Sequence, residues 1–206
     1  MSELPLFPLR TVLFPGGLLP LRIFEPRYLD LVRRCLRSGE TFGVVLIRDG
    51  GETGPVGALA EVGTSARILD FETLPDGLLG LLCRGDRRFR LKARRTQPDG
   101  LHVAEVEWLA EEVAVPLAPG QRPVARLLRR VLAELGERGR FLEPRYDDAG
   151  WVGSRLAELL PLERDAQQRL LELDDSGARL RALEPLLDTE AMSRQEGPAG
   201  PAGGER

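Results

Sequence analysis

Two different spacings of apolar residues divide the chain at about residue 110. In the first part, short apolar runs alternate with proline and glycine, a pattern typical of strands and tight turns. Between residues 4 and 24 this pattern predicts short strands joined by tight turns. The run from Phe42 to Ile47 is continuously apolar, which predicts a strand buried on both faces.

One helix interrupts this strand-rich part. After Pro26, apolar side chains recur at three- and four-residue intervals through Leu36, with arginines between them. Ser38-Gly39 follows, and glycine favours the left-handed conformation that ends many helices. We therefore expect a helix that begins at Pro26 and ends near Ser38.

The remaining strands are predicted from turns and alternation. Residues 56–71 are expected to form one extended, bent strand, and the turns Pro75-Asp76-Gly77 and Pro98-Asp99-Gly100 predict hairpins. Beyond residue 87 the alternation is strict. Phe89, Leu91 and Ala93 are predicted on one face and the basic residues on the other: Arg88, Arg90, Lys92 and Arg94.

After Pro119 the apolar spacing becomes helical. Four amphipathic segments follow, centred near residues 129, 155, 171 and 183, and short connections between them predict a small bundle. The predicted fold class is therefore α+β. We expect a β-rich unit over residues 1–115 with one inserted helix, a C-terminal helical bundle over 120–190, and a disordered tail over 191–206.

Composition narrows the class of protein. The chain has 206 residues, of which 42% are hydrophobic and 30% charged, with a net charge of −3. These values are ordinary for globular proteins and exclude collagenous, mostly disordered and disulfide-rich secreted classes. No apolar run approaches the length of a membrane span. With only Cys35 and Cys83, we expect buried, reduced thiols and a cytoplasmic location without a membrane partner.

The sequence contains few candidate catalytic residues. His102 is the only histidine, no serine lies in a nucleophile motif, and no cysteine or histidine pair has metal-ligand spacing. We expect His102 to lie exposed at the end of a strand. Lys92 is the only lysine and lies within a predicted strand, so a phosphate-binding loop is not expected. The sequence therefore predicts no catalytic residue, no metal and no cofactor.

The basic face of residues 88–94 raises the alternative of an RNA-binding surface. The next predicted strand places Glu105 and Glu107 on its own solvent face. Pairing of opposite charges between the two strands explains both rows without a ligand. No aromatic residue interleaves with the basic face to stack a base. A paired, solvated face is therefore favoured, and a nucleic-acid partner is not expected.

The segment before the first predicted helix allows two interpretations. Glu25 precedes Pro26, where a carboxylate interacts favourably with the helix dipole. In the simpler interpretation Glu25 is a cap, and Phe24 and Tyr28 belong to the core. In the other, an exposed polar and aromatic rim contacts a partner through Arg22, Glu25, Arg27 and Tyr28.

Several ordered motifs resemble the Lon N-terminal, or substrate-binding, domain. The opening carries Leu4-Pro-Leu-Phe-Pro-Leu-Arg10, Val12-Leu-Phe-Pro-Gly16 and Leu19-Pro-Leu-Arg-Ile-Phe-Glu-Pro-Arg-Tyr28. Phe42-Gly-Val-Val-Leu-Ile47, Val62-Gly-Thr-Ser-Ala-Arg-Ile68, Leu74-Pro-Asp-Gly77 and Gly85-Asp-Arg-Arg-Phe89 follow in order. Leu160-Pro-Leu, Leu170-Leu-Glu-Leu-Asp-Asp175 and Arg179-Leu180 resemble its helical end, so the resemblance covers about residues 3–188.

The resemblance implies a PUA-like β pseudo-barrel followed by a helical subdomain. It also implies that the domain binds substrate polypeptide. Lon proteases continue into ATPase and Ser-Lys peptidase modules, and this chain ends before either. We therefore expect a stand-alone, non-catalytic binding module that acts as an adaptor, rather than a protease.

The expected partner is unfolded or exposed apolar polypeptide, or a dedicated protein. We expect an apolar groove where the barrel meets the bundle. Its predicted contributors are the aromatic residues Phe14, Phe24, Tyr28 and Trp151, rimmed by Arg22, Glu25 and Arg27. RNA binding ranks second, and an enzyme acting on a small molecule ranks third, because no constellation of ionisable groups supports it.

Overall fold

The computed structural model describes residues 2–52, 56–134 and 136–195. Its strands are β1 (Ser2–Leu9), β2 (Leu18–Ile23), β3 (Phe42–Leu46), β4 (Val62–Thr73), β5 (Leu79–Thr96) and β6 (His102–Trp108). Its helices are α1 (Pro26–Ser38), α2 (Arg122–Ala133), α3 (Ala149–Leu159), α4 (Arg164–Glu172) and α5 (Ser176–Gln195). Short 3₁₀ turns lie at Pro119–Gln121 and Gly136–Phe141. The predicted α+β class is confirmed.

The described strands form one sheet in the order β2-β5-β4-β3-β1-β6, and β5 also pairs with β6. Strand β1 runs parallel to β3, and the other pairs are antiparallel. Pairing between β5 and β6 closes the sheet on itself. Strand β2 stays outside this closure, because it pairs only with the first half of β5.

Local sequence explains the elements next to the site. Helix α1 has Pro26 in its first turn, and Gly39 ends it with φ 72°, as the sequence predicts. The hairpin between β4 and β5 turns at Gly77, where φ is 83°. The predicted strand over residues 56–71 is shorter than expected. Val56 makes only an isolated bridge to Gly50, and β4 begins at Val62.

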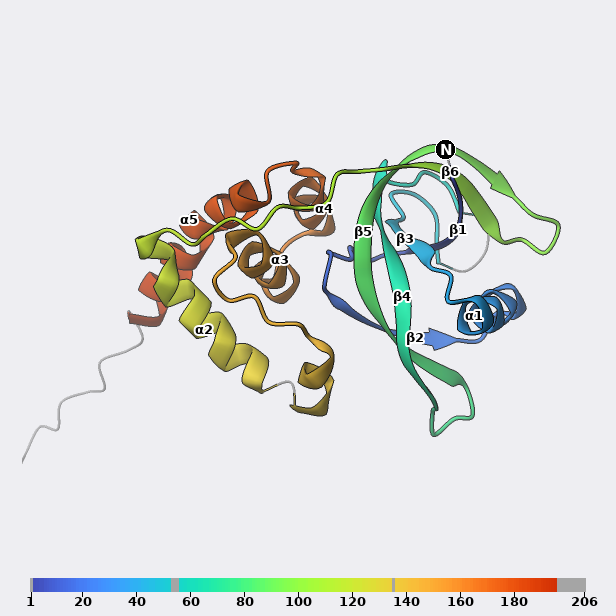
Figure 1. Ribbon diagram of the computed structural model, residues 1–206, viewed down its shortest axis with the longest axis horizontal. Helices are drawn as coiled ribbons and strands as arrows, with labels where there is room; N and C mark the ends of the chain where they lie inside the picture. The colour runs from blue at the N-terminus through green and yellow to red at the C-terminus, as the bar shows by residue number, and fades with distance from the viewer. Residues whose placement is uncertain (1, 53–55, 135, 196–206) are drawn as a thin grey trace, which may run out of the picture.

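The long strands β4 and β5 stand between the helices α2–α5 on one side and α1 on the other (Figure 1). A core cluster joins the two sides, since it contains Phe14 and Phe89 from the sheet region together with Trp151, Leu171 and Leu180 from the helices. A second cluster lies between α1 and the sheet around Ile23, Tyr28 and Leu81. The strand-rich and helical parts therefore share buried surface.

Two boundary predictions fall at the C-terminal end. Helix α5 continues to Gln195, beyond the boundary expected at residue 190. Residues 196–206 of the predicted tail lie outside the described residues. None of the helices in the described ranges has the length and apolarity needed to cross a bilayer.

Candidate functional site: a cleft between the sheet and the helices

A cleft of about 760 Å³ lies where the sheet meets the helices. Strand β2 and the segment before it form one wall, and residues of α2, α3 and α4 face them. From the sheet side the lining includes Phe7, Leu9, Thr11, Val12, Leu13, Leu18, Leu19, Pro20, Leu21, Arg22, Ile23, Phe24, Glu25, Tyr28 and Leu82. From the helical side it includes Leu132, Leu142, Arg155, Glu158, Leu159 and Gln167.

Exposed apolar side chains stand on both sides of this cleft. Phe24, between β2 and α1, is 54% exposed, and Leu159, at the end of α3, is 44% exposed. Leu142 and Leu18, which also line the cleft, are partly buried. Apolar side chains left in water on two facing walls favour a ligand that covers them.

An ion pair forms part of the helical wall. Arg155 Nε lies 2.8 Å from Glu158 Oε2, and the same guanidinium donates to the carbonyl oxygen of Pro15 at 3.1 Å. Burial raises the pKa of the Glu158 carboxyl, and the charge of Arg155 opposes that shift. This pair links α3 to the loop that precedes β2 and so holds the two walls together.

The structure brings together some of the predicted site residues. Arg22, Phe24, Glu25 and Tyr28 all line the cleft. Arg22 is paired with Asp76, and Glu25 Oε2 lies 2.7 Å from Arg27 Nη2. Arg27 also donates to the Gly100 carbonyl oxygen at 2.8 Å, so it fixes the start of α1 against the β5–β6 hairpin.

Two aromatic predictions are corrected by burial. Phe14 is 0% exposed in the core, with the Arg179 guanidinium 5.3 Å from its ring centroid, so it cannot contribute to a surface. Tyr28 is 4% exposed and stacks on Phe7 with ring centroids 3.9 Å apart. The exposed rim predicted at Tyr28 is therefore wrong, and this ring supports the cleft from behind.

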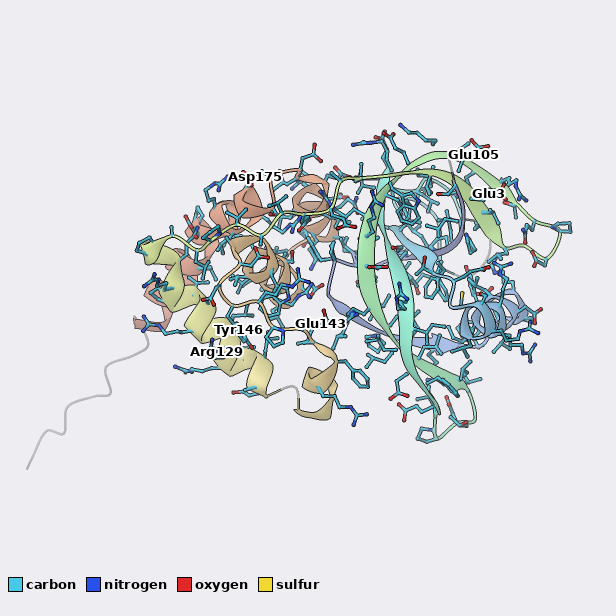
Figure 2. All side chains as sticks on the ribbon, in the orientation of Figure 1. Glu3, Glu105, Arg129, Glu143, Tyr146 and Asp175 are labelled. Atoms are coloured by element: carbon cyan, nitrogen blue, oxygen red, sulfur yellow. The ribbon has the colours of Figure 1, made fainter. Side chains whose placement is uncertain are left out.

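Trp151 belongs to a different place. It is buried and packs edge-to-face on Tyr146, with ring centroids 5.1 Å apart. On the helical side, the Arg129 guanidinium lies over Tyr146, 4.6 Å from its ring centroid (Figure 2). Trp151 lines a separate polar cavity of about 280 Å³, and it is not part of the cleft.

The predicted basic face of β5 is also corrected. Arg88 is 4% exposed and donates to the carbonyl oxygens of Leu171 and Leu173, both at 2.8 Å. Its Nε lies 3.3 Å from Glu112 Oε1. Strand β5 passes beneath the helices at this point, so both of its faces are covered there. Arg88 is a residue of the core, unavailable to nucleic acid.

The rest of that face is also paired, but among the described residues only Lys92 pairs with a predicted glutamate of β6. Lys92 contacts Glu107 in an ion pair, and Arg90 Nη1 lies 3.7 Å from Glu61 Oε2. Arg94 lies near the Val56 carbonyl oxygen at 3.5 Å. These contacts leave no continuous row of unpaired cations along residues 88–94.

His102 is the remaining correction. It is 7% exposed, and its Nδ1 lies 3.0 Å from Thr96 Oγ1 across the hairpin. Burial lowers the pKa of the imidazole, and the nearby Arg94 adds to the effect. The expectation of an exposed histidine is wrong, because His102 is the first residue of β6 and this strand is buried from its start.

Sequence reasoning missed much of the cleft. The pattern of β2 does not distinguish Leu18, Leu19 and Leu21 from ordinary strand residues. Nothing in the pattern of α3 singles out Glu158 or Leu159. One signal was present: Pro20 interrupts an apolar strand, and proline in a sheet marks an edge strand. An edge strand is where a sheet leaves backbone groups and side chains available.

Comparison with known proteins identifies the family. Residues 3–189 match the model of the ATP-dependent protease La (LON) substrate-binding domain. The chain belongs to this family. A Lon N-terminal domain protein from Xanthomonas campestris is 44% identical, with a TM-score of 0.74 over 90% of this chain and 98% of that one. The N-terminal domain of Lon protease from the Mycobacterium avium complex, at 17% identity and a TM-score of 0.61, shares the fold.

Full-length relatives show what part of a Lon protease this Lon domain corresponds to. The Lon protease of Cytophaga hutchinsonii is 27% identical over 199 residues, which are 92% of this chain and 24% of that protein. The chain thus spans about a quarter of the length of such relatives. Protein cereblon from Danio rerio is 33% identical over 120 residues, 55% of this chain. The family resemblance carried by the ordered motifs is confirmed.

Proposed function

We propose that this Lon substrate-binding domain is a non-catalytic module that binds unfolded or exposed apolar polypeptide in the cleft between sheet and helices. The observation that carries the proposal is the placement of Phe24 and Leu159, both exposed, on facing walls of one apolar cleft. A role as an adaptor in the cytoplasm, acting on behalf of a separate protease or a dedicated protein partner, is consistent with that site.

The finer description of the fold belongs to the same proposal. We describe the closed sheet as a PUA-like pseudo-barrel and α2–α5 as a helical bundle. Support for this comes from the pairing of β5 with β6, which closes the sheet, and from the shared burial of Val152, Leu171 and Leu180 among the helices.

A matched pair of substitutions tests the cleft. Phe24 and Phe71 are exposed to a similar degree, 54% and 58%, but only Phe24 lines the cleft. We expect Phe24→Ala to weaken binding of a fluorescein-labelled, reduced and carboxymethylated α-lactalbumin about tenfold. Full burial of an aromatic side chain contributes about 1.5–3 kcal/mol, and only about half of Phe24 is left to be buried. Phe71→Ala is the control and should bind as the parent does.

Fluorescence anisotropy measures both affinities. Equal loss in the two variants would indicate nonspecific apolar contact, and undiminished binding by Phe24→Ala would remove the cleft from the account. Failure of the parent protein to bind any unfolded polypeptide would contradict the proposed function itself.

A further inference from the structure

Strand β2 is an edge of the sheet. It pairs with β5 along its whole length, from Leu18 opposite Arg84 to Ile23 opposite Leu79, and with no other strand in the described ranges. Every second residue of β2 is partly or fully exposed: Leu18, Pro20 and Arg22. An unpaired edge of this kind presents backbone donors and acceptors to another chain.

The register decides which backbone groups are free. The Gly85 N–H donates to the Gly17 carbonyl oxygen at 2.9 Å, so position 17 is bonded to β5. Because bonded positions alternate in an antiparallel pair, Leu19, Leu21 and Ile23 also face β5. Pro20, which has no N–H, then falls in the outward-facing set, where proline is tolerated in a sheet.

The outward set therefore offers two N–H groups, at Leu18 and Arg22, and carbonyl oxygens at Leu18, Pro20 and Arg22. No hydrogen bond to these groups is present from the part of the chain that the structure describes. A polypeptide backbone in extended conformation can supply hydrogen-bond partners for these free groups.

The cleft runs along this edge. Successive residues of a strand point to opposite faces of the sheet. All six residues of β2 nevertheless line the cleft. Leu19, Leu21 and Ile23 pack toward α1, whereas Leu82, the partner of Pro20, is on the opposite face. A cleft that reaches side chains of both faces must follow the edge between them.

We infer that an extended polypeptide segment adds to the free edge of β2 as a further strand, with its successive side chains on the two faces of the sheet that the cleft reaches. This inference rests on the proposed function and states how the ligand is held. The lining carries the carboxylates of Glu25, Glu52 and Glu158 against the guanidiniums of Arg22 and Arg155. The charge balance therefore disfavours acidic segments.

The first test observes the edge directly. The probe is a seven-residue peptide of alternating valine and threonine with a lysine added at each end. In the labelled full chain, hydrogen exchange of the Leu18 and Arg22 amides should slow at least about tenfold at saturation, because both become hydrogen-bonded. Saturable amide shifts without slower exchange at these two positions would overturn the inference and leave the proposed function intact.

The second test alters one backbone donor at a time. Arg22→Pro and Arg22→Ala both remove the side chain, but only the proline variant removes the outward N–H. Position 22 makes no ladder bond to β5, so both variants should keep the sheet. We expect Arg22→Pro to bind the peptide about three- to tenfold more weakly than Arg22→Ala, the worth of one peptide hydrogen bond.

A gain of affinity completes the test. Pro20→Ala supplies an outward N–H that the parent lacks, and we expect it to bind the peptide about three- to tenfold more tightly. The Pro20→Ala comparison remains decisive if Arg22→Pro does not fold, which circular dichroism of that variant would show. Unchanged affinity in Pro20→Ala would overturn strand addition, whereas absence of any peptide binding to the parent would instead contradict the proposed function.

Discussion

Buried arginines set the chemistry at the residue scale. Arg179 is 0% exposed and donates to the Leu170 carbonyl oxygen, to Ser154 Oγ and to both carboxylate oxygens of Glu112. Glu112 also faces Arg88. Burying a guanidinium is costly unless its donors are satisfied. Here a carbonyl, a hydroxyl and a carboxylate satisfy Arg179, and Arg88 of β5 donates to the carbonyl oxygens of Leu171 and Leu173. The chain therefore fastens its helices to its sheet through side chains that would ordinarily lie in water.

Substitution of Arg88 tests this anchor. We expect Arg88→Ala to lower the free energy of unfolding by about 3–5 kcal/mol, because it leaves the carbonyls of Leu171 and Leu173 unpaired and removes a cation from Glu112. Arg90 lies two residues further along the same strand, and its side chain is partly exposed. Arg90→Ala should therefore lower the free energy of unfolding by less than about 1 kcal/mol. Urea unfolding measures both, and similar values for the two variants would contradict the assignment of Arg88 to the core.

The thiol of Cys83 gives a prediction in pH. Burial raises the pKa of Cys83 to about 12 from an ordinary value of 9.0. The folded state therefore keeps a proton that the unfolded state releases, and stability is lost as pH rises from about 9 toward 12. The loss for this group is about 1.4 kcal/mol per pH unit. Cys83→Ala should flatten the fall of unfolding free energy above pH 9, and an unchanged slope would contradict the burial of the thiol.

Close approach of strands decides the packing at the element scale. A Cβ at Gly63 in β4 would lie 2.5 Å from the Val44 carbonyl oxygen and 2.6 Å from Phe89 Cζ. Nothing but hydrogen fits there, which explains why a glycine occupies this position in the buried half of β4. Strands β3, β4 and β5 can then pack tightly beneath the helices.

Two alanine substitutions test this packing. Gly63→Ala should destabilise the protein by about 1–3 kcal/mol through overpacking. Gly120→Ala, where no atom lies within 4 Å of the new methyl group, should be near neutral. Thermal unfolding monitored by circular dichroism compares the two, and a stable Gly63→Ala variant would show that β3 and β4 are further apart than described.

Elements could be predicted from sequence where their pattern is local. The apolar spacing of residues 26–38 and the cap at Gly39 are properties of one segment, so the prediction of α1 was correct. The burial of Arg88 depends on carbonyls more than eighty residues away, at Leu171 and Leu173. The alternation of apolar and basic residues within β5 does not show that a distant helix buries part of its basic face. The same limit explains why Phe24 was identified for the cleft while Leu159 was not.

At the scale of the whole molecule, one core cluster spans the sheet and the helices. We propose that the units over residues 1–115 and 120–190 are subdomains that unfold together. The two tryptophans serve as reporters, because Trp108 lies in β6 and Trp151 in α3. Trp108→Phe and Trp151→Phe leave one fluorescent reporter in each part.

Each single-tryptophan variant should show a fluorescence transition that coincides with its own circular dichroism transition in urea, as expected for a two-state domain. A fluorescence transition that precedes or follows the loss of helix signal in the same variant would show that the two parts unfold separately. In that case one part would lose its fold while the other kept it.

The central claim is that polypeptide binds along β2 and the facing end of α3. An amide-shift titration of the isotope-labelled chain with reduced, carboxymethylated α-lactalbumin tests it most directly. The account predicts saturable shifts centred on Leu18–Ile23, Phe24 and Leu159. An absence of shifts at high polypeptide concentration, or shifts confined to the paired face around Arg90 and Lys92, would contradict it.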